Sequence, residues 1–384
     1  MTQALSAESR AHILPSYARQ DVTFVRGEGC WLVADDGRRY LDFAAGVAVV
    51  GLGHGHPAPV AAAHAQIDLL WHTSNLYWTQ PMTRLAELLS ARFGGAQAFF
   101  CNSGAEAIEA AIKYARKATG KPEIVALEGS FHGRTLGALS ATGQPAKRAG
   151  FGPLVPGVAF ARPNDVESLE AAVTPGDRTA LILLEPVLGE GGVYPLDPGF
   201  LTAAAEIAAE VGALLALDEI QTGVGRTGTF FAFEQAGMRP ALVTLAKGLA
   251  NGLPIGCLLV ADEAAGGFAP GDHASTFGGN PVSCAAACAV VEEITDELLA
   301  GVRASGARLT TGLSALRGVV ETRGLGLLVA AELDRPAAPV VAAALEQGLL
   351  LTSAGERVLR LTPPLVVSAA EVDRALEILR EVLA

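Results

Sequence analysis

Lysine is scarce in this chain, since only five of its 28 basic residues are lysine and the rest are arginine. One of the five, Lys247, stands in the stretch "ALVTLAKGLANGLPIG", where an apolar run ends and no other charged residue is near. Lysine can lose its proton and condense with an aldehyde, whereas the guanidinium of arginine stays charged. We therefore predict a chemical role for Lys247. The other lysines are Lys113, Lys117, Lys121 and Lys147.

Cysteine is also scarce, and the sequence has neither long apolar runs nor an excess of positive charge. The five cysteines are scattered and odd in number, which argues against a disulfide framework and favours buried thiols in a reducing cytoplasm. Apolar runs are broken within about a dozen residues, too short to span a bilayer. The N-terminus has no basic start followed by an apolar block, so we predict no secretory signal. A net charge of −12 without a basic stripe argues against nucleic-acid binding.

The apolar segments that are present predict an α/β protein. Between residues 98 and 260, short apolar runs alternate with alanine-rich amphipathic segments, as in a doubly wound, mostly parallel sheet. From Asn280 onward, longer helical patterns and short strands predict a smaller α+β domain. We expect an N-terminal arm with a hairpin over residues 1–45, a large domain over 46–275 and a small C-terminal domain over 276–384.

Polar residues follow the predicted strands, at the edge where open α/β sheets bind ligands. "CNSGA" follows the first strand of the sheet, and its small residues at a helix start form an anion site suited to phosphate. Acids, an amide and Lys247 follow later strands. Because these groups share one edge, we predict that they form a single site, with the candidates Ser103, Gly104, Ala105, Phe131, His132, Arg134, Glu185, Glu190, Asp218, Gln221 and Lys247.

Three other motifs match patterns of different chemistry but lack part of each pattern. "GVGRTG" (Gly223 to Gly228) matches the dinucleotide fingerprint, but it does not directly follow a strand and no helix follows it. "GHGHP" places His54 and His56 two residues apart without a cysteine or acid to complete a metal site, so a turn is expected and no metal. Ser103 lies in "NSGAE", which is not a nucleophile elbow.

A nucleophilic lysine, a phosphate site at a helix start and an acid at a neighbouring strand end are together what pyridoxal phosphate requires. Lys247 would join the aldehyde of this cofactor as an imine. The phosphate would rest on Ser103, Gly104 and Ala105. Asp218 would keep the pyridine nitrogen protonated, so that the ring can act as an electron sink.

The chain resembles, nearly end to end, the class III (ω-amino) aminotransferases of the fold-type I pyridoxal phosphate enzymes, and among them the acetylornithine aminotransferases. The motifs that carry the resemblance are "LDFAAGVAVVGLGHGHP", "CNSGAEAIEAAIKYAR", "FHGRTLGALSATGQ", "LDEIQTGVGRTG", "LAKGLANGLPIG", "STFGGNP" and "RLTPPL". "LDEIQTGVGRTG" with a lysine 29 residues after its aspartate is highly specific to the class. The resemblance implies the fold-type I architecture, pyridoxal 5'-phosphate as cofactor and a homodimer with shared active sites.

The resemblance also implies roles for residues around the cofactor. Gln221 would lie near the ring hydroxyl, and Phe131 would stack on the ring face. Thr276, in "STFGGNP", would reach the phosphate bound by the partner subunit. Ser275, beside it, would lie at the substrate entrance. A monomer would then be inactive.

For the substrates, the resemblance implies that Arg134 binds a carboxylate and that Arg360 holds the α-carboxylate of glutamate. Glu190 would mask Arg360 while the amine donor is bound, so that one pocket serves two unlike substrates. The implied reaction is a ping-pong transfer of the terminal amino group of N2-acetyl-L-ornithine to 2-oxoglutarate. It would serve arginine biosynthesis.

Several amine donors are compatible with these motifs. Val47 falls where ornithine δ-aminotransferases carry tyrosine, which would favour a neutral acetylated nitrogen over a free ammonium. Val50, Leu188 and Trp78 depart from residues common in acetylornithine enzymes. 4-Aminobutyrate, succinylornithine, ornithine and a carrier-linked amine of lysine biosynthesis are the alternative donors. Outside the class, the alternatives are an NAD-dependent oxidoreductase and a non-catalytic acidic binding protein.

Overall fold

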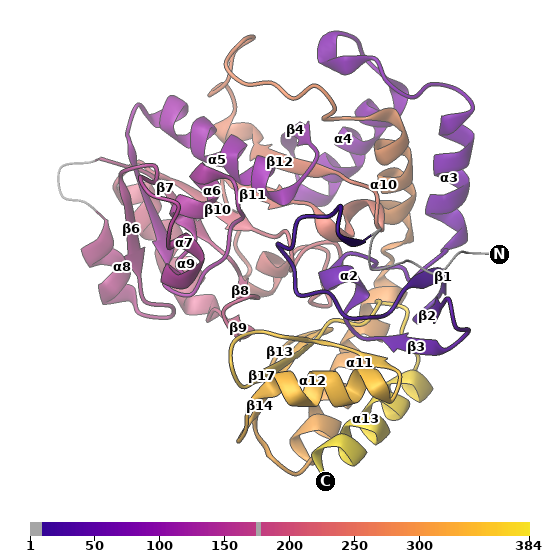
Figure 1. Cartoon of the computed structure of the whole chain (residues 1–384). Helices are drawn as coiled ribbons and strands as arrows, with labels where there is room; N and C mark the ends of the chain where they lie inside the picture. The colour runs from indigo at the N-terminus through magenta and orange to yellow at the C-terminus, as the bar shows by residue number, and fades with distance from the viewer. Residues whose placement is uncertain (1–9, 174–177) are drawn as a thin grey trace.

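The computed structural model describes residues 10–173 and 178–384, and its largest element is a seven-stranded sheet (Figure 1). The strands lie in the order β4-β12-β11-β10-β7-β5-β6. Their bounds are β4 Ala96–Cys101, β5 Glu123–Leu127, β6 Val158–Ala161, β7 Thr179–Leu184, β10 Leu214–Asp218, β11 Leu242–Leu245 and β12 Gly256–Ala261. The helices between them are α5 Gly104–Thr119, α6 Leu136–Ala141, α7 Pro145–Arg148, α8 Val166–Ala172 and α9 Pro198–Glu210.

Strand β7 shows why the sequence folds this way. Its six residues, "TALILL", are all buried. Leu181 and Leu183 share a core cluster with Ile108 of α5. The intervening Ile182 belongs to a different cluster, together with Phe200 of α9. A strand without polar alternation is expected where helices cover both faces of a parallel sheet, and the α/β prediction is confirmed.

The sheet is mostly parallel, as predicted, and β12 is the exception. It runs antiparallel to both of its neighbours, β4 and β11. Only ten residues, 246–255, join β11 to β12, whereas a parallel return needs a crossover of about a dozen or more. The connection instead forms the short turn η3 (Lys247–Ala250), which puts Lys247 directly beyond the carboxyl end of β11.

The smaller C-terminal domain lies below the central sheet in Figure 1, in orange and yellow. Its antiparallel sheet has the order β13-β14-β17-β16, with bounds β13 Val319–Leu325, β14 Leu328–Leu333, β16 Thr352–Ser353 and β17 Val358–Leu361. It packs with α11 Asp296–Ser314, α12 Ala337–Glu346 and α13 Ala369–Leu383. The α+β prediction is confirmed from α11 onward, whereas α10 Pro281–Glu293, which follows Asn280, packs against α3 Pro57–Ile67 and α4 Gln80–Phe93. A turn at Gly326 divides "GLGLLVAAEL" between β13 and β14.

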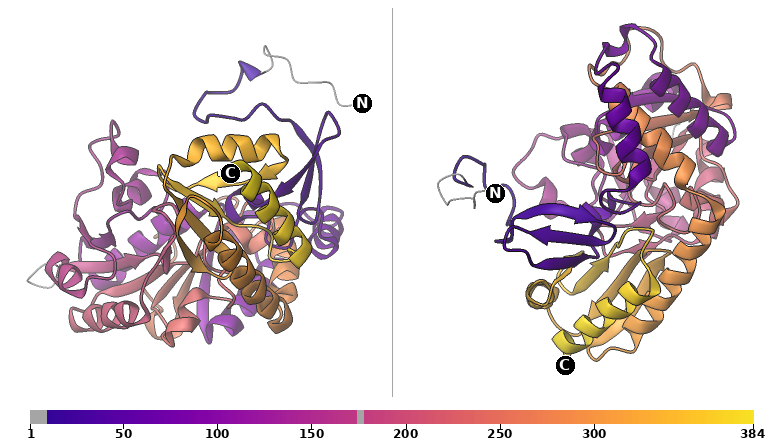
Figure 2. Two further views of the ribbon diagram at one scale, coloured as in Figure 1. Left: turned by 90° about the horizontal axis from the view of Figure 1, so that it is seen from below. Right: turned by 90° about the vertical axis from the view of Figure 1, so that its right-hand side faces the viewer.

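The N-terminal hairpin is fixed to the C-terminal part of the chain. Strands β1 Phe24–Glu28, β2 Trp31–Ala34 and β3 Arg39–Asp42 are antiparallel neighbours. The fourth strand of their sheet is β15 Leu349–Leu350, which pairs with β3 in parallel. The right-hand view of Figure 2 shows the indigo hairpin beside the yellow elements. This pairing joins two segments that are about 300 residues apart in the sequence.

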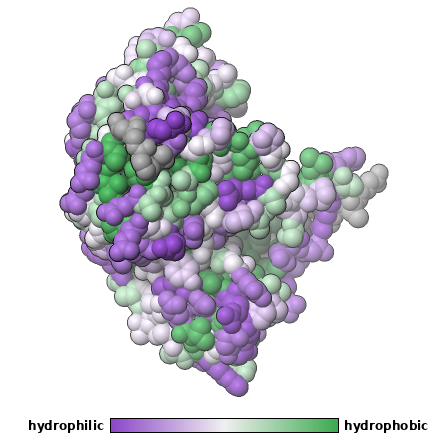
Figure 3. All heavy atoms as spheres, turned by 90° about the vertical axis from the view of Figure 1, so that its left-hand side faces the viewer, coloured by the Kyte–Doolittle hydropathy of each residue, from purple (hydrophilic) through white to green (hydrophobic). Residues whose placement is uncertain are grey.

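The surface is mixed in character. On the face shown in Figure 3, hydrophilic and hydrophobic residues are interspersed. Among the described residues, no helix is long and apolar enough to cross a membrane. Large apolar side chains are nevertheless exposed between the helices α3 Pro57–Ile67 and α4 Gln80–Phe93, namely Leu69, Leu70, Trp71, Leu76, Tyr77 and Trp78.

Candidate active site

A cavity of about 410 Å³ opens at the carboxyl ends of the parallel strands. It brings together most of the residues that the sequence nominates from separate strand ends. They are Ser103, Gly104, Ala105, Phe131, His132, Arg134, Glu185, Glu190, Asp218, Gln221 and Lys247. In a doubly wound sheet, side chains that follow different parallel strands meet at this edge.

Four other nominated residues do not line this cavity. Arg360 is buried on β17 and reaches the cavity through its contacts with Glu190 and Gln221. Ser275 and Thr276 line an adjoining hollow of about 400 Å³, which shares Asn102 with the main cavity. The side chains of Asn102 and Ser275 are hydrogen-bonded, 3.1 Å from Nδ2 to Oγ.

Val47, the fourth, lies in an unusual backbone turn. Residues 45–48 (α2, Ala45–Ala48) all have positive φ, with +46° at Ala45 and +66° at Val47. Each non-glycine residue in this left-handed region costs about 1–2 kcal/mol. The carboxylate of Asp42 fixes the start of the turn by accepting the N–H groups of Ala44 and Ala45. Val47 itself is 39% exposed, and its neighbour Val49 lines the cavity instead.

The amino end of α5 has the geometry that an anion site requires. Ser103 is the N-cap, and its Oγ accepts the N–H of Glu106 at 3.2 Å. The first N–H groups of a helix have no partner within it, and in the described part of the chain those of Gly104 and Ala105 are not used by other residues. A Cβ at Gly104 would lie 2.8 Å from Ile220 Cδ1, so glycine keeps the helix end close to the residues after β10.

Asp218 ends β10 and is held by three hydrogen bonds. Its Oδ2 lies 2.7 Å from His132 Nδ1. Its Oδ1 accepts the N–H of Ile220 at 3.1 Å and the hydroxyl of Thr244 at 3.3 Å. His132 is buried, and among the described residues its Nε2 has no partner. The sequence placed His132 near the site without a role, and the structure shows that it orients Asp218.

Lys247 follows β11 with φ +37°, in the left-handed region. Burial lowers the pKa of its ammonium from 10.5 to about 8, although nearby Glu190 opposes this shift. Across residues 10–173 and 178–384, its Nζ has no hydrogen-bond partner. A half-buried amine at the cavity wall that is partly neutral near pH 8 and not engaged by other groups is suited to nucleophilic attack.

Glu185 connects two loops of the site, a contact that the sequence did not reveal. Its Oε1 accepts the N–H of Phe131 at 2.7 Å, and its Oε2 accepts the N–H of Gly189 at 3.2 Å. Burial raises the pKa of this carboxyl group to about 7, while the neighbouring His132 lowers it. The only signal in the sequence was the position of Glu185 directly after a strand.

Glu190 and Arg360 form an ion pair at the side of the cavity nearest the C-terminal domain. Arg360 also donates to Gly189 O at 3.2 Å and, through Nε, to the hydroxyl of Thr352 at 3.2 Å. Burial raises the pKa of Glu190, but the charges of Arg360, Lys247 and Lys147 outweigh it and hold the pKa below its usual value. Glu190 is therefore ionised at neutral pH.

Two of the three motifs that suggested other chemistry make structural contacts instead. Arg226, in "GVGRTG", is buried and donates to the carbonyl oxygens of Leu327 and Pro363, so this loop binds the C-terminal domain. His54, in "GHGHP", lies 2.8 Å from Asp42 through its Nε2.

Known proteins resemble this chain over almost its whole length. Residues 15–383 match the family model described as Aminotransferase class-III. An acetylornithine aminotransferase from Gloeobacter violaceus is 50% identical, with 97% of this chain and 96% of that protein covered. An acetylornithine aminotransferase from Archaeoglobus fulgidus is 46% identical, with 96% and 98% covered.

Solved structures agree in fold. An ornithine aminotransferase from Toxoplasma gondii, with partial occupancy of PLP at its active site, has a TM-score of 0.93 and 32% identity, covering 98% of this chain and 92% of that one. An N-acetylornithine aminotransferase from Stenotrophomonas maltophilia has a TM-score of 0.84 and 37% identity, covering 96% and 97%. The chain is thus a member of the class III aminotransferases.

Proposed function

We propose that this chain is an acetylornithine aminotransferase that uses pyridoxal 5'-phosphate. It would move the terminal amino group of N2-acetyl-L-ornithine to 2-oxoglutarate, giving N-acetylglutamate 5-semialdehyde and glutamate for arginine biosynthesis. Two acetylornithine aminotransferases that are 46% and 50% identical support this choice of substrate. The observation that carries it is the ion pair of Arg360 with Glu190, which lines the same cavity as Lys247, because such a pair lets a single pocket accept two unlike substrates.

The residues of the cavity fit the cofactor. The free N–H groups at the amino end of α5 would hold its phosphate. The carboxylate of Asp218 would pair with the pyridine nitrogen, Phe131 would cover the ring face and Gln221 would lie near the ring hydroxyl. Lys247 supplies the amine. When bound, pyridoxal phosphate provides a carbonyl group and an electron sink for the transfer of an amino group.

Two arginines would bind the carboxylates of the substrates. Arg134, exposed at the cavity, would take the carboxylate of acetylornithine at the end away from the reacting amine. Arg360 would take the α-carboxylate of glutamate or 2-oxoglutarate. Acetylornithine has no carboxylate at its reacting end, so in that half of the reaction Glu190 neutralises Arg360 instead.

We also propose a homodimer in which Thr276 reaches the phosphate bound by the partner subunit and Ser275 borders the substrate entrance. Phe277, next to them, is 60% exposed. Asn75 joins this segment to the exposed apolar residues 69–78 by donating to Ser275 O and Gly278 O. A group of exposed aromatic side chains is typical of a protein interface, and the group around Phe277 lies next to the active site.

The proposed domains are residues 1–45, 46–275 and 276–384.

The proposed location is the cytoplasm. All five cysteines are free thiols, and four of them are buried. Free buried thiols are typical of proteins from reducing compartments.

The direct test is a transamination assay of the purified protein with acetylornithine and 2-oxoglutarate, with and without added pyridoxal phosphate. We expect glutamate to form and the protein to show the visible absorption of a bound pyridoxal cofactor. A protein that stays colourless with added cofactor contradicts the proposal as a whole.

The Glu190–Arg360 pair gives a prediction about the two half-reactions. Arg360→Ala should lower kcat/KM for glutamate and 2-oxoglutarate by at least about tenfold, or ~1.4 kcal/mol, and affect acetylornithine much less. Glu190→Ala should shift the preference toward glutamate, because Arg360 is no longer masked. Single-turnover measurements of each half-reaction check both variants. Arg308→Ala, which removes an exposed ion pair with Asp373, is the matched control, and equal losses in both halves would rule out the switch.

The choice of amine gives a second prediction. Val47 and its neighbour Val49, which lines the cavity, are apolar and offer a free ammonium no hydrogen bond. We expect kcat/KM for acetylornithine to exceed that for ornithine by at least about tenfold. Steady-state rates with acetylornithine, ornithine and 4-aminobutyrate, each against 2-oxoglutarate, decide between the donors. The proposal for the substrate fails if ornithine or 4-aminobutyrate is the best donor.

A further inference from the structure

The backbone around Glu190 is fixed on both sides. The N–H of Gly189 is bound by Glu185, and its carbonyl oxygen is bound by Arg360. On the other side, Arg323 donates from Nε to Gly192 O at 2.9 Å. A Cβ at Gly191 would lie 2.6 Å from Gly129 O, so this stretch is also closely packed. If Glu190 changes partner during the reaction, its side chain must rotate while the backbone stays in place.

Releasing Arg360 creates an electrostatic problem. The Glu190 side chain is only 22% exposed and is ion-paired with Arg360. When Arg360 instead binds the carboxylate of the acceptor, Glu190 would be left as an unpaired, mostly buried charge. Removing one partner from a buried pair is strongly unfavourable, because the remaining charge has neither its partner nor full hydration. A second cation within reach of Glu190 would remove most of this penalty.

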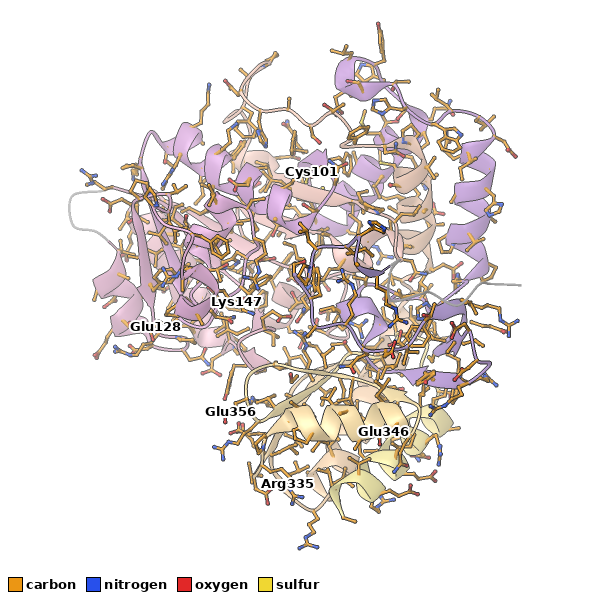
Figure 4. The ribbon with its side chains drawn as sticks, viewed as in Figure 1. Cys101, Glu128, Lys147, Arg335, Glu346 and Glu356 are labelled. Carbon is orange, nitrogen blue, oxygen red and sulfur yellow. The ribbon has the colours of Figure 1, made fainter. Side chains whose placement is uncertain are left out.

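Two cations lie over the ring of Phe131, Arg134 and Lys147. Arg134 is proposed above to bind a substrate carboxylate, which leaves Lys147 for Glu190. Lys147 lies in α7, and its Nζ is 5.3 Å from the centre of the Phe131 ring. In the described part of the chain it has no ion-pair partner. Figure 4 labels Lys147 in the upper body of the molecule, on the side toward the C-terminal domain that carries Glu356 and Arg335.

The contacts of Glu185 join the segment next to Lys147 to the segment that contains Glu190. One carboxylate oxygen of Glu185 holds the N–H of Phe131, and the other holds the N–H of Gly189. The backbone of the residue whose ring Lys147 covers and the backbone of the residue before Glu190 are therefore bound to the same carboxylate, and Phe131 and Glu190 line the same cavity. The charge of Lys147 is also among those that lower the pKa of Glu190. The other lysine in that group, Lys247, is the nucleophile of the proposed reaction.

We propose that Lys147 is the second partner of Glu190, which pairs with Arg360 in the amine-donor half-reaction and with Lys147 when a dicarboxylate occupies Arg360. This inference rests on the proposed function and deepens it. Lys147 is thus a positioning residue that acts through Glu190, and it matters only when glutamate, 2-oxoglutarate or a similar dicarboxylate is bound.

The test replaces Lys147 by methionine, which keeps length and removes charge. In the enzyme with its cofactor bound, Lys147→Met should weaken binding of glutarate, an unreactive dicarboxylate, by about tenfold in calorimetry. It should raise KM for 2-oxoglutarate similarly and leave the acetylornithine half-reaction within about twofold. Lys147→Arg should behave like the wild type. Lys117→Met, which removes a lysine paired with Asp272 at the surface, is the matched control.

A double-mutant cycle separates this role from direct binding of the substrate by Lys147. Glu190→Gln has no charge to be compensated, so adding Lys147→Met to it should have no further effect on glutarate binding. A tenfold loss that persists in the Glu190→Gln background, equal losses in both half-reactions, or no loss at all would each overturn the inference. A wild-type enzyme that does not accept acetylornithine would contradict the proposed function, and the glutarate cycle would still decide the role of Lys147.

Discussion

Replacing Lys247 with arginine is expected to abolish transamination and leave the fold intact. Arginine keeps the positive charge beside Glu190 but cannot act as a nucleophile at neutral pH. We expect turnover to fall by at least about a thousandfold, or ~4 kcal/mol, with a melting temperature close to that of the wild type. Borohydride reduction in the presence of pyridoxal phosphate, followed by peptide mapping, should attach the cofactor to Lys247 in the wild type and to no residue in the variant.

The pH dependence provides an independent check on the same residue. Because burial lowers the pKa of Lys247 to about 8, its amine is mostly protonated at pH 7 and mostly neutral above pH 8. Covalent capture of the cofactor by the apoenzyme should therefore accelerate as the pH rises and level off a little above pH 8. An unperturbed lysine would accelerate up to a pH of about 10.4. Lys117→Arg is the control, and a label on Lys113, Lys117, Lys121 or Lys147 would contradict the assignment.

The strands and the convergence of the site could be predicted from the sequence because their signals are local. "TALILL" and "EIVAL" are buried strands with the expected bounds, and the groups that follow them meet at one edge for a topological reason. The direction of β12 could not be read from its apolar run, because a buried strand looks the same in either direction. The direction of β12 depends instead on the number of residues in the connection that contains Lys247, which is too short for a parallel crossover.

Contacts between segments distant in the sequence were not predictable. Glu185 was visible as an acid after a strand, but its role as a bridge between Phe131 and Gly189 depends on how two loops fold back. The left-handed turn at Val47 has no local signal, since alanine and valine avoid positive φ. The surroundings impose it, because Asp42 fixes the start of the turn and Thr362 binds the carbonyl oxygen of Ala44. Strained turns of this kind tend to occur at functional sites.

Asp218→Asn should slow turnover by about a hundredfold or more, or ~2.7 kcal/mol, with the cofactor still bound. A carboxylate next to a pyridine nitrogen stabilises its protonated form, because an opposite charge within hydrogen-bond reach in a dry site is screened little. Asparagine has the same shape and keeps an oxygen for the N–H of Ile220 and the hydroxyl of Thr244. It removes the charge, which is the property that the chemistry requires.

The contact with His132 explains why the fold should tolerate this change. His132 Nδ1 lies 2.7 Å from Asp218 Oδ2, and a neutral imidazole can present this nitrogen as donor or acceptor. It can therefore accept a hydrogen bond from the amide of asparagine. Turnover at saturating substrate, cofactor content after denaturation and the melting temperature should be measured together. Asp272→Asn, at a half-buried ion pair with Lys117, is the matched control. Near-normal turnover in Asp218→Asn would mean that the charge of Asp218 is not needed, whereas loss of the cofactor would assign Asp218 to binding alone.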